Sequence, residues 1–251
     1  MRLGLIGAGN MASALARGIG EPVFVHDVDE QKAAALAEEL GGEAVGSNAE
    51  LAERADALVL CHKPAQLDDV AGEIEGARVV VSILAATPTD RLAEAYPGAS
   101  IYRFIPNMPT EVKRGVLCYV AGPGAADGPE EEILELMGRA GHVIRLDQEP
   151  LIEPAMALMS CGPAFLALVA ETFAEAGAAH GLDPDDAMRM VVETMGGTAD
   201  YLAQHDYDGP ALRKRVATPG GTTERGLITL EERGLRDVTR AAVDAVVEAT
   251  R

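Results

Sequence analysis

The chain has 251 residues, of which 48% are hydrophobic and only 4% aromatic, so it can form one large or two modest domains packed mainly with aliphatic side chains. Its 40 acidic residues against 21 lysines and arginines give a formal net charge of −19, which argues against nucleic acid or an anionic membrane as a partner. Cys61, Cys118 and Cys161 follow no metal-ligand spacing and predict reduced thiols, no metal site and a cytoplasmic protein without a leader segment.

The first twelve residues predict a buried strand that turns tightly into a helix. The apolar run 3–6 leads into Gly7, Gly9 and Ala12 at the spacing G-x-G-x-x-A. In this pattern the first glycine makes the turn, the second lets the backbone approach a pyrophosphate, and the small third residue lets helix and strand pack closely. The helix N-terminus then offers free N–H groups to phosphates. A plain strand-to-helix turn without a ligand fits the same pattern.

A second apolar run, residues 22–26, ends in Asp27. A carboxylate at the tip of the second strand is placed to hydrogen-bond ribose hydroxyls and to repel a 2′-phosphate, which favours NAD over NADP. The alternative is that Asp27 only caps the helix that begins near residue 29.

Alternating helix and strand signals continue from there. The sequence predicts a helix over 31–40, a short strand over 43–45 and a helix cap at Ser47. The apolar run 57–61 predicts a strand that ends just before Lys63. Residues beyond the C-terminal end of a parallel strand face the ligand crevice, so Lys63 is a candidate contact, although a solvated lysine fits as well.

The same alternation extends to residue 148. Further strands are predicted over 78–83, 100–104, 116–121 and 142–146, with a helix opening near residue 89 and an acidic helix over 129–139. Two prolines flank Asn107 and predict a rigid loop at the sheet edge where a nicotinamide ring would lie. We therefore expect an α/β domain over 1–148, with a doubly wound sheet of about eight mostly parallel strands.

From residue 149 onward no convincing strand signal recurs. We expect an all-helical domain over 149–251 that begins with one long helical stretch over 150–180. Asp183-Pro184 predicts the cap of a second helix that reaches about 204, Asp208-Gly209-Pro210 predicts the start of a short third helix, and the last helices are expected over 222–251. The nearly uncharged run 155–170 falls short of a membrane span and predicts a buried helix or an oligomer interface. This half would struggle to bury its apolar faces alone, so we expect dimerisation through it.

The turn 218–223 forms a second candidate site. Backbone N–H groups around Gly220 and Gly221, the following helix N-terminus and the hydroxyls of Thr218, Thr222 and Thr223 predict a nest for a small carboxylate. The alternative is a plain Pro-Gly-Gly turn in which Thr222 caps the helix.

Five motifs together resemble the pyrroline-5-carboxylate reductase family, in the right order and over essentially the whole chain. They are Ile-Gly-Ala-Gly-Asn-Met at 6–11, His-Lys-Pro at 62–64, Pro-Asn-Met-Pro at 106–109, Gly-Pro-Ala-Phe at 162–165 and Thr-Pro-Gly-Gly-Thr-Thr at 218–223. The last is the most specific and the glycine turn the least. Met159-Ser160-Cys161 replaces the family's usual Ser-Gly-Ser, Met108 replaces a threonine, and Ala86 replaces a glycine.

The resemblance implies a Rossmann-type domain followed by a helical dimerisation domain, in a homodimer or a higher homo-oligomer built from dimers. It also implies reduction of 1-pyrroline-5-carboxylate to L-proline, the last step of proline biosynthesis, with NAD(P)H, and Asp27 slightly favours NADH. The expected cofactor contacts are Gly7, Gly9, Asn10, Met11, Asp27, Asn48, Lys63, Pro64, Ala85 and Asn107. The expected substrate contacts, across the dimer interface, are Thr218, Gly220, Gly221, Thr222 and Thr223. A cyclic imine protonates readily and then accepts hydride, so positioning matters more than a strong acid, and Thr223 is the expected catalytic hydroxyl.

The departures at Met108, Met159 and Cys161 leave two alternatives open. One is a related reductase that acts on another cyclic imine or a carbonyl substrate. The other is a non-catalytic dinucleotide-binding paralogue, against which the intact 218–223 turn argues.

Overall fold

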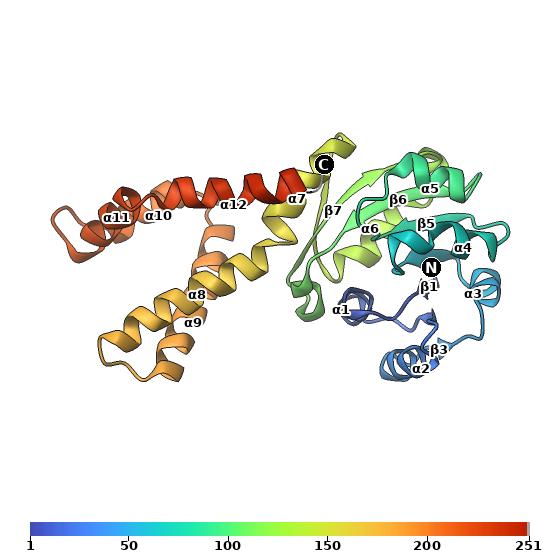
Figure 1. The fold of residues 1–251 in the computed structure, drawn as a ribbon, viewed down its shortest axis with the longest axis horizontal. Coiled ribbons are helices and arrows are strands. Elements are labelled where there is room, and N and C mark those ends of the chain that lie inside the picture. Colours follow the sequence, from blue (N-terminus) through green and yellow to red (C-terminus); the bar gives the residue numbers. More distant parts are fainter. Residues whose placement is uncertain (250–251) are drawn as a thin grey trace. The chain divides into compact units, whose positions relative to one another are not determined.

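The computed structural model describes residues 1–249, which form two compact units (Figure 1). The first covers Met1–Pro163 and the second Ala164–Ala249. The predicted boundary between the sequence domains, at 148/149, stays a prediction.

The first unit contains one eight-stranded sheet in the order β3-β2-β1-β4-β5-β6-β7-β8. Its strands are β1 Leu3–Ile6, β2 Phe24–His26, β3 Glu43–Ala44, β4 Ala57–Leu60, β5 Val79–Ser82, β6 Ser100–Ile105, β7 Gly115–Ala121 and β8 Gly141–Arg145. All neighbours pair in parallel except β6 and β7, which are antiparallel. This confirms the predicted doubly wound, mostly parallel sheet. Ile6 pairs with both His26 and Leu60, so β1, β2 and β4 end at the same level.

Helices cover both faces of this sheet. They are α1 Asn10–Ile19, α2 Glu30–Glu39, α3 Asn48–Arg54, α4 Leu67–Gly72, α5 Thr89–Ala95, α6 Glu130–Gly138 and α7 Ile152–Met159. One buried cluster contains Leu15, Leu36 and Ile133, from α1, α2 and α6. A second cluster contains Leu51 from α3 and Leu92 from α5. Every residue of β1, β4 and β5 is buried, as expected of parallel strands covered on two faces.

An ion pair between a buried arginine and a partly buried glutamate fixes the chain where it leaves the sheet. Glu149 accepts hydrogen bonds from Arg103 on β6 (2.7 Å) and from both the backbone N–H and the hydroxyl of Thr89 (2.9 Å each). The side chain of Arg103 is only 5% exposed, so Glu149 is the charge that compensates it inside the protein. Immediately afterwards, Ile152 and Met159 of α7 pack in a small cluster against β6 and β7.

The single long helix predicted over 150–180 is wrong, because the helix is interrupted. α7 ends at Met159 and α8 runs from Gly162 to Ala179. At the break, the N–H groups of Ser160 and Cys161 both donate to the carbonyl of Met156, at 2.9 and 3.0 Å. Pro163 then lies in the first turn of α8, where its missing N–H is not needed.

The helical stretch Glu149–Ala179 is long and apolar enough to cross a membrane, with a mean hydropathy of 1.6. The prediction that the nearly uncharged run 155–170 falls short of a membrane span does not hold for this whole stretch. This is a property of length and composition alone, and the absence of a membrane partner stays a prediction. Only 17% of its most apolar window is buried within the chain, so of the two predictions for this run, a buried helix or an oligomer interface, the buried helix is wrong.

The second unit has no strand among its described residues. After α8 it contains α9 Pro184–Ala203, α10 Gly209–Val216, α11 Thr222–Glu232 and α12 Leu235–Ala249. Asp183 and Asp208 cap α9 and α10 by accepting backbone N–H groups, as their positions before proline-containing first turns predict.

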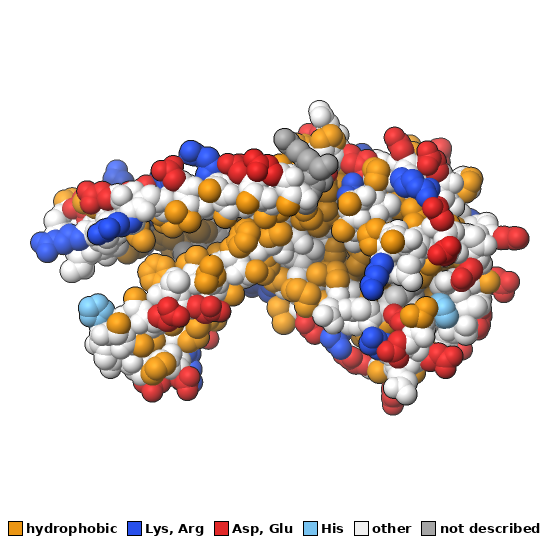
Figure 2. Space-filling view, in the orientation of Figure 1, with side chains coloured by type: hydrophobic (Ala, Val, Ile, Leu, Met, Phe, Trp, Pro, Cys, Tyr) orange, Lys and Arg blue, Asp and Glu red, His pale blue; other side chains and the backbone are white. Residues whose placement is uncertain are grey.

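The described part of this unit buries only three hydrophobic residues, the alanines 170, 174 and 187. Large apolar side chains remain exposed instead, as the orange surface along these helices shows (Figure 2). They include Leu166, Leu168, Phe173, Met190 and Val238. An apolar surface of this extent marks an interface with another molecule.

We expect Glu149→Gln to lower the free energy of unfolding by about 3 kcal/mol, because it leaves the buried Arg103 guanidinium without its charge partner. Burial alone would raise the pKa of Glu149, but the hydrogen bonds from Arg103 and Thr89 outweigh it and hold the pKa below the ordinary 4.5. The carboxylate therefore stabilises the fold above that pH and loses its contribution as the pH falls through the folded-state pKa. Urea denaturation followed by circular dichroism should show a large difference from the wild type at neutral pH, and this difference should shrink as the pH falls through the folded-state pKa of Glu149.

The matched control is Glu135→Gln, which removes an exposed ion pair with Arg139 and should cost less than about 0.5 kcal/mol. Equal losses in the two variants would contradict the role given to Glu149.

Candidate functional site

The turn after β1 requires its first glycine. Gly7 has a φ of +108°, and a Cβ there would lie 3.0 Å from the backbone carbonyl of Cys61. At Gly9, by contrast, a Cβ would meet no atom within 4 Å. Gly9 is the N-cap of α1, with no side-chain cap and no acidic residue in the first turn. The first N–H groups of α1 therefore remain available to an anion.

Asp27 joins this turn to the end of β2. Its two carboxylate oxygens accept the N–H groups of Ala8 (2.7 Å) and Asp29 (2.8 Å). The N-cap of α2 is Asp29, whose carboxylate accepts from the N–H of Lys32. The alternative in which Asp27 only caps that helix is therefore not what the structure shows. A carboxylate offers about four lone-pair sites, so Asp27 retains capacity for further donors.

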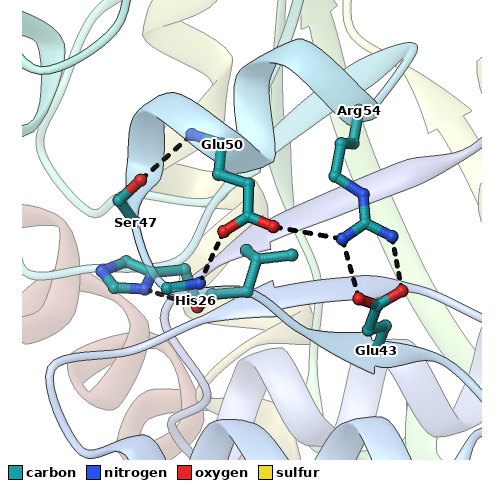
Figure 3. Close-up of polar contacts among 7 residues, drawn as sticks. His26, Glu43, Ser47, Glu50 and Arg54 are labelled. Atoms are coloured by element: carbon teal, nitrogen blue, oxygen red, sulfur yellow. Dashed lines mark hydrogen bonds and ion pairs between the residues drawn. The ribbon is translucent and has the colours of Figure 1, made fainter.

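Hydrogen bonds fix the loop between β3 and α3 beside Asp27 (Figure 3). The ring Nδ1 of His26 lies 3.1 Å from the carbonyl oxygen of Val45. The carboxylate of Glu50 accepts the N–H of Gly46 (3.0 Å), and Ser47 caps α3 by accepting the N–H of Glu50 (3.1 Å). The first residue of α3, Asn48, is thereby held in a defined place.

Arg54, at the end of α3, holds this loop through ion pairs with two glutamates (Figure 3). Its guanidinium donates to Glu50 (3.2 Å) and to Glu43 on β3 (2.8 Å). The same group lies 4.4 Å from the centre of the Phe24 ring on β2. Arg54 thus joins this helix to the two-residue edge strand β3 and to the neighbouring strand β2.

These segments border a cleft of about 580 Å³ within the first unit. It lies at the carboxyl ends of β1, β2 and β4, where the chain switches direction across the sheet and where ligands of such folds bind. The expected cofactor residues that line it are Gly7, Gly9, Asp27, Asn48, Lys63, Pro64 and Ala85. The others, Asn10, Met11 and Asn107, do not; the first two lie in the first turn of α1.

Sequence reasoning missed several cleft-lining residues, namely His26, Lys32, Cys61 and His62. Three of them could have been found from their positions, because they end or directly follow strands β2 and β4. Burial raises the pKa of the Cys61 thiol to about 12, so this thiol is protonated and unreactive at neutral pH. All three cysteines are free.

Two polar atoms of cleft-lining residues are buried and have no hydrogen-bond partner among residues 1–249. They are Oδ1 of Asn48 and Nε2 of His62. Unmet hydrogen-bonding capacity beside a cleft is what a ligand with matching groups would satisfy.

Both polar atoms of the Asn107 amide are hydrogen-bonded to other residues of the first unit. Its amide nitrogen donates to the carbonyl of Met159 at the end of α7 (2.8 Å), and its amide oxygen accepts the N–H of Val116 on β7 (2.9 Å). The side chain therefore links α7 to the sheet, and its place beside a nicotinamide ring stays a prediction. The neighbouring Met108, one of the departures from the family pattern, is 44% exposed.

Ala86, which stands where the family pattern has a glycine, adopts a backbone conformation that favours glycine. Its φ of +50° lies in the left-handed region, which disfavours an alanine by about 1 kcal/mol or more. The strained residue directly follows Ala85, which lines the cleft.

The turn 218–223, in the second unit, uses both of its glycine N–H groups internally. Gly220 (φ +76°) donates to the carboxylate of Glu224 (2.7 Å), and Gly221 donates to the carbonyl of Thr218 (2.9 Å). This differs from the expected nest, in which these N–H groups face the ligand. The N-cap of α11 is Gly221 and not Thr222, so the plain turn capped by Thr222 is not observed either. The N–H groups of the first turn of α11 and the hydroxyls of Thr218, Thr222 and Thr223 remain for an anion.

Among the described residues 1–249, no three His, Cys, Asp or Glu side chains gather in a way that could hold a metal ion.

The chain is similar to known proteins over its whole length. Residues 149–251 match the family model "Pyrroline-5-carboxylate reductase dimerisation", and residues 2–86 match "NADP oxidoreductase coenzyme F420-dependent". A pyrroline-5-carboxylate reductase of Pseudomonas aeruginosa is 30% identical over 97% of this chain and 93% of its own length. One of Treponema pallidum is 30% identical over 100% of both chains.

Solved structures agree with these sequence matches. A pyrroline-5-carboxylate reductase of Coxiella burnetii is 27% identical with a TM-score of 0.89, over 99% of this chain and 96% of that one. A pyrroline carboxylate reductase of Plasmodium falciparum with NADP bound is 25% identical with a TM-score of 0.87, over 100% of this chain and 97% of that one.

The two glycines of the first turn should respond differently to alanine. We expect Gly7→Ala to destabilise the protein by about 2 kcal/mol, because the methyl group meets the Cys61 carbonyl and the positive φ is strained. Gly9→Ala should cost less than about 1 kcal/mol, because its methyl group enters open space and only the cap preference is lost. Chemical denaturation of both variants measures the difference, and equal losses would contradict this account of the turn.

Proposed function

The chain belongs to the pyrroline-5-carboxylate reductase family, and on this premise we propose that it is an NAD(P)H-dependent oxidoreductase that reduces 1-pyrroline-5-carboxylate to L-proline, the last step of proline biosynthesis. The observation that carries the proposal is similarity to such reductases over 97–100% of the chain. It is supported by a glycine turn that borders a cleft of about 580 Å³ in the first unit.

The residues of the cleft fit a dinucleotide. Bound NAD(P)H supplies a hydride from its nicotinamide ring. We assign the uncapped N–H groups of α1 at Asn10 and Met11 to the pyrophosphate, which approaches over the open face of Gly9. The other proposed contacts are Gly7, Asp27, Asn48, Lys63, Pro64, Ala85 and Asn107.

The finer proposal is that NADH is preferred over NADPH. The wall formed by the end of β2 and the start of α2 contains two carboxylates, Asp27 and Asp29, and the ammonium group of Lys32 is paired with Asp29 at 3.2 Å. A 2′-phosphate brought here would meet negative charge, whereas ribose hydroxyls would meet acceptors.

We assign the substrate carboxylate and ring to Thr218, Gly220, Gly221, Thr222 and Thr223. The glycines form the turn, and the N–H groups and positive dipole end of α11 attract the carboxylate. The hydroxyl of Thr223 faces the imine nitrogen and positions it as the carbon accepts hydride. The strongly acidic chain attracts no anion as a whole, so binding depends on this local arrangement.

The protein acts as a homo-oligomer on a small-molecule substrate. We propose a homodimer, or a higher oligomer built from dimers, because among residues 164–249 the second unit buries no hydrophobic side chain larger than alanine. We also propose a cytoplasmic location.

The central test is oxidation of NADH and NADPH by the purified protein with 1-pyrroline-5-carboxylate, and identification of the proline formed. We expect a higher kcat/KM with NADH, and Asp27→Ser should reduce this preference about tenfold or more by removing the negative charge. Asp90→Ser, on the exposed face of α5, is the control and should change neither value. A preference of the wild type for NADPH would overturn the assignment of Asp27 alone. Cofactor binding without oxidation would favour another imine or carbonyl substrate, or a non-catalytic role.

For Thr223→Ala we expect kcat to fall about 10- to 100-fold, because a hydroxyl that holds the imine acts most strongly as charge develops. The dissociation constant of NADH should change less than about twofold, and Thr223→Ser should restore most of the rate. Thr229→Ala removes a hydroxyl that only bonds the carbonyl of Arg225 on the same helix and serves as the control. Unchanged turnover in Thr223→Ala would place the substrate elsewhere.

A further inference from the structure

Two residues that line the proposed cofactor cleft each have a buried polar atom without a hydrogen-bond partner. Among residues 1–249, the buried side-chain N and O atoms without a hydrogen-bond partner belong to Asn48, His62, Tyr96, Arg103 and Thr110. Only Asn48 and His62 line the cleft. A protein retains such groups at a cost in stability, and their position beside a cleft calls for a functional explanation.

The hydrogen bonds of His62 fix which of its ring atoms can accept. Its Nδ1 lies 2.9 Å from the carbonyl oxygen of Lys63. A carbonyl oxygen can only accept, so Nδ1 carries the proton. Burial lowers the pKa of His62 below its ordinary value, which keeps the ring neutral at neutral pH. The unpartnered Nε2 therefore presents a lone pair and no proton.

A hydrogen bond likewise fixes which atom of the Asn48 amide can accept. Its Nδ2 donates to the carboxylate of Glu73, directly after α4, at 2.8 Å. Since an ionised carboxylate has no proton to donate, the nitrogen must face Glu73 and the unpartnered atom must be the oxygen. Asn48 is only 5% exposed and begins the helix whose preceding loop is held by Ser47 and Glu50 (Figure 3).

We propose that His62 is a specificity-determining residue of the cofactor cleft, whose Nε2 accepts a hydrogen bond from a donor group on the adenosine half of the dinucleotide, with Asn48 Oδ1 as a second acceptor. The inference rests on the proposed function, because it takes the cleft to hold a dinucleotide. The adenosine half carries two kinds of uncharged donor, the 6-amino group of adenine and the ribose hydroxyls. Glu73 is a positioning residue that keeps the amide oxygen of Asn48 free for such a donor.

The test asks whether the loss of affinity caused by removing a donor from the ligand depends on the presence of His62. Wild type, His62→Leu and His62→Gln are titrated with NADH, with its hypoxanthine analogue, which lacks the 6-amino group, and with analogues that lack one hydroxyl of the adenosine ribose. Fluorescence of the reduced nicotinamide reports each dissociation constant without catalysis. His142→Leu, at an exposed position on β8, is the matched control.

We expect His62→Leu to bind NADH about three- to tenfold more weakly than the wild type, as for one neutral hydrogen bond. The analogue that lacks the donor should bind the wild type more weakly by a similar factor, and this penalty should vanish in His62→Leu. A penalty confined to the hypoxanthine analogue identifies the amino group, and one confined to a deoxyribose analogue identifies a hydroxyl. His62→Gln, whose side-chain oxygen also accepts, should keep most of the affinity.

Three results would overturn the proposal. They are equal affinity of the wild type for NADH and all analogues, an analogue penalty that persists unchanged in His62→Leu, and a His62→Gln variant as weak as His62→Leu. The first requires no variant and so stands even if a substitution prevents folding. A wild type that reduces 1-pyrroline-5-carboxylate but shows any of these results overturns only this inference, whereas a wild type that binds no dinucleotide overturns the proposed function.

Discussion

The missing side chain of Gly7 is the constraint on which the first unit depends. Because a Cβ would lie 3.0 Å from the Cys61 carbonyl, only glycine lets the end of β1 lie this close to the end of β4. The N–H of Gly7 also donates to the carbonyl of His26 (2.8 Å), so this one residue joins the ends of three adjacent strands. The next N–H, of Ala8, then meets Asp27, and α1 begins with its first N–H groups free. The cleft follows from a close approach of backbones, before any ligand is considered.

The two candidate sites share one local device, although they lie in different units. In each, a glycine just before the helix cap donates its N–H to a glutamate in the first turn of the helix. Gly46 donates to Glu50 at 3.0 Å, and Gly220 donates to Glu224 at 2.7 Å. This is a variant of the capping box, in which the glutamate reaches one residue further back than usual. This hydrogen bond closes the loop before the helix. The N–H groups of the first two helical residues remain available to a ligand.

Sequence reasoning succeeded where a local pattern carries the structure. The fully buried strands read as short apolar runs, and Ser47, Asp183 and Asp208 were recognisable as caps. The break at Ser160 and Cys161 was missed although the pair Gly162-Pro163, which disfavours a continuous helix, directly follows it. The backbone hydrogen bonds that form the break leave no side-chain signal of their own. Antiparallel pairing of β6 and β7 could have been expected, since a short connection cannot return a strand in parallel.

For the sites, the glycine turns and Asp27 could be predicted because their spacing carries the chemistry. The orientation of the Asn48 amide could not be predicted, because it is fixed by a hydrogen bond to Glu73, 25 residues further along the chain. The cofactor contact that the resemblance predicts for Asn107 also gave no sign that its amide joins α7 to β7.

Because residues 164–249 bury only alanines among their hydrophobic side chains, the stability of the second unit should depend on protein concentration. Helices that bury only Ala170, Ala174 and Ala187 by themselves gain little from the hydrophobic effect until another copy covers their larger side chains. Their stability is then governed by mass action and rises with the amount of chain present. The first unit buries two large apolar clusters within one chain, whereas the second unit depends for its apolar burial on the oligomer that we propose. Dilution should therefore unfold the helices before the sheet.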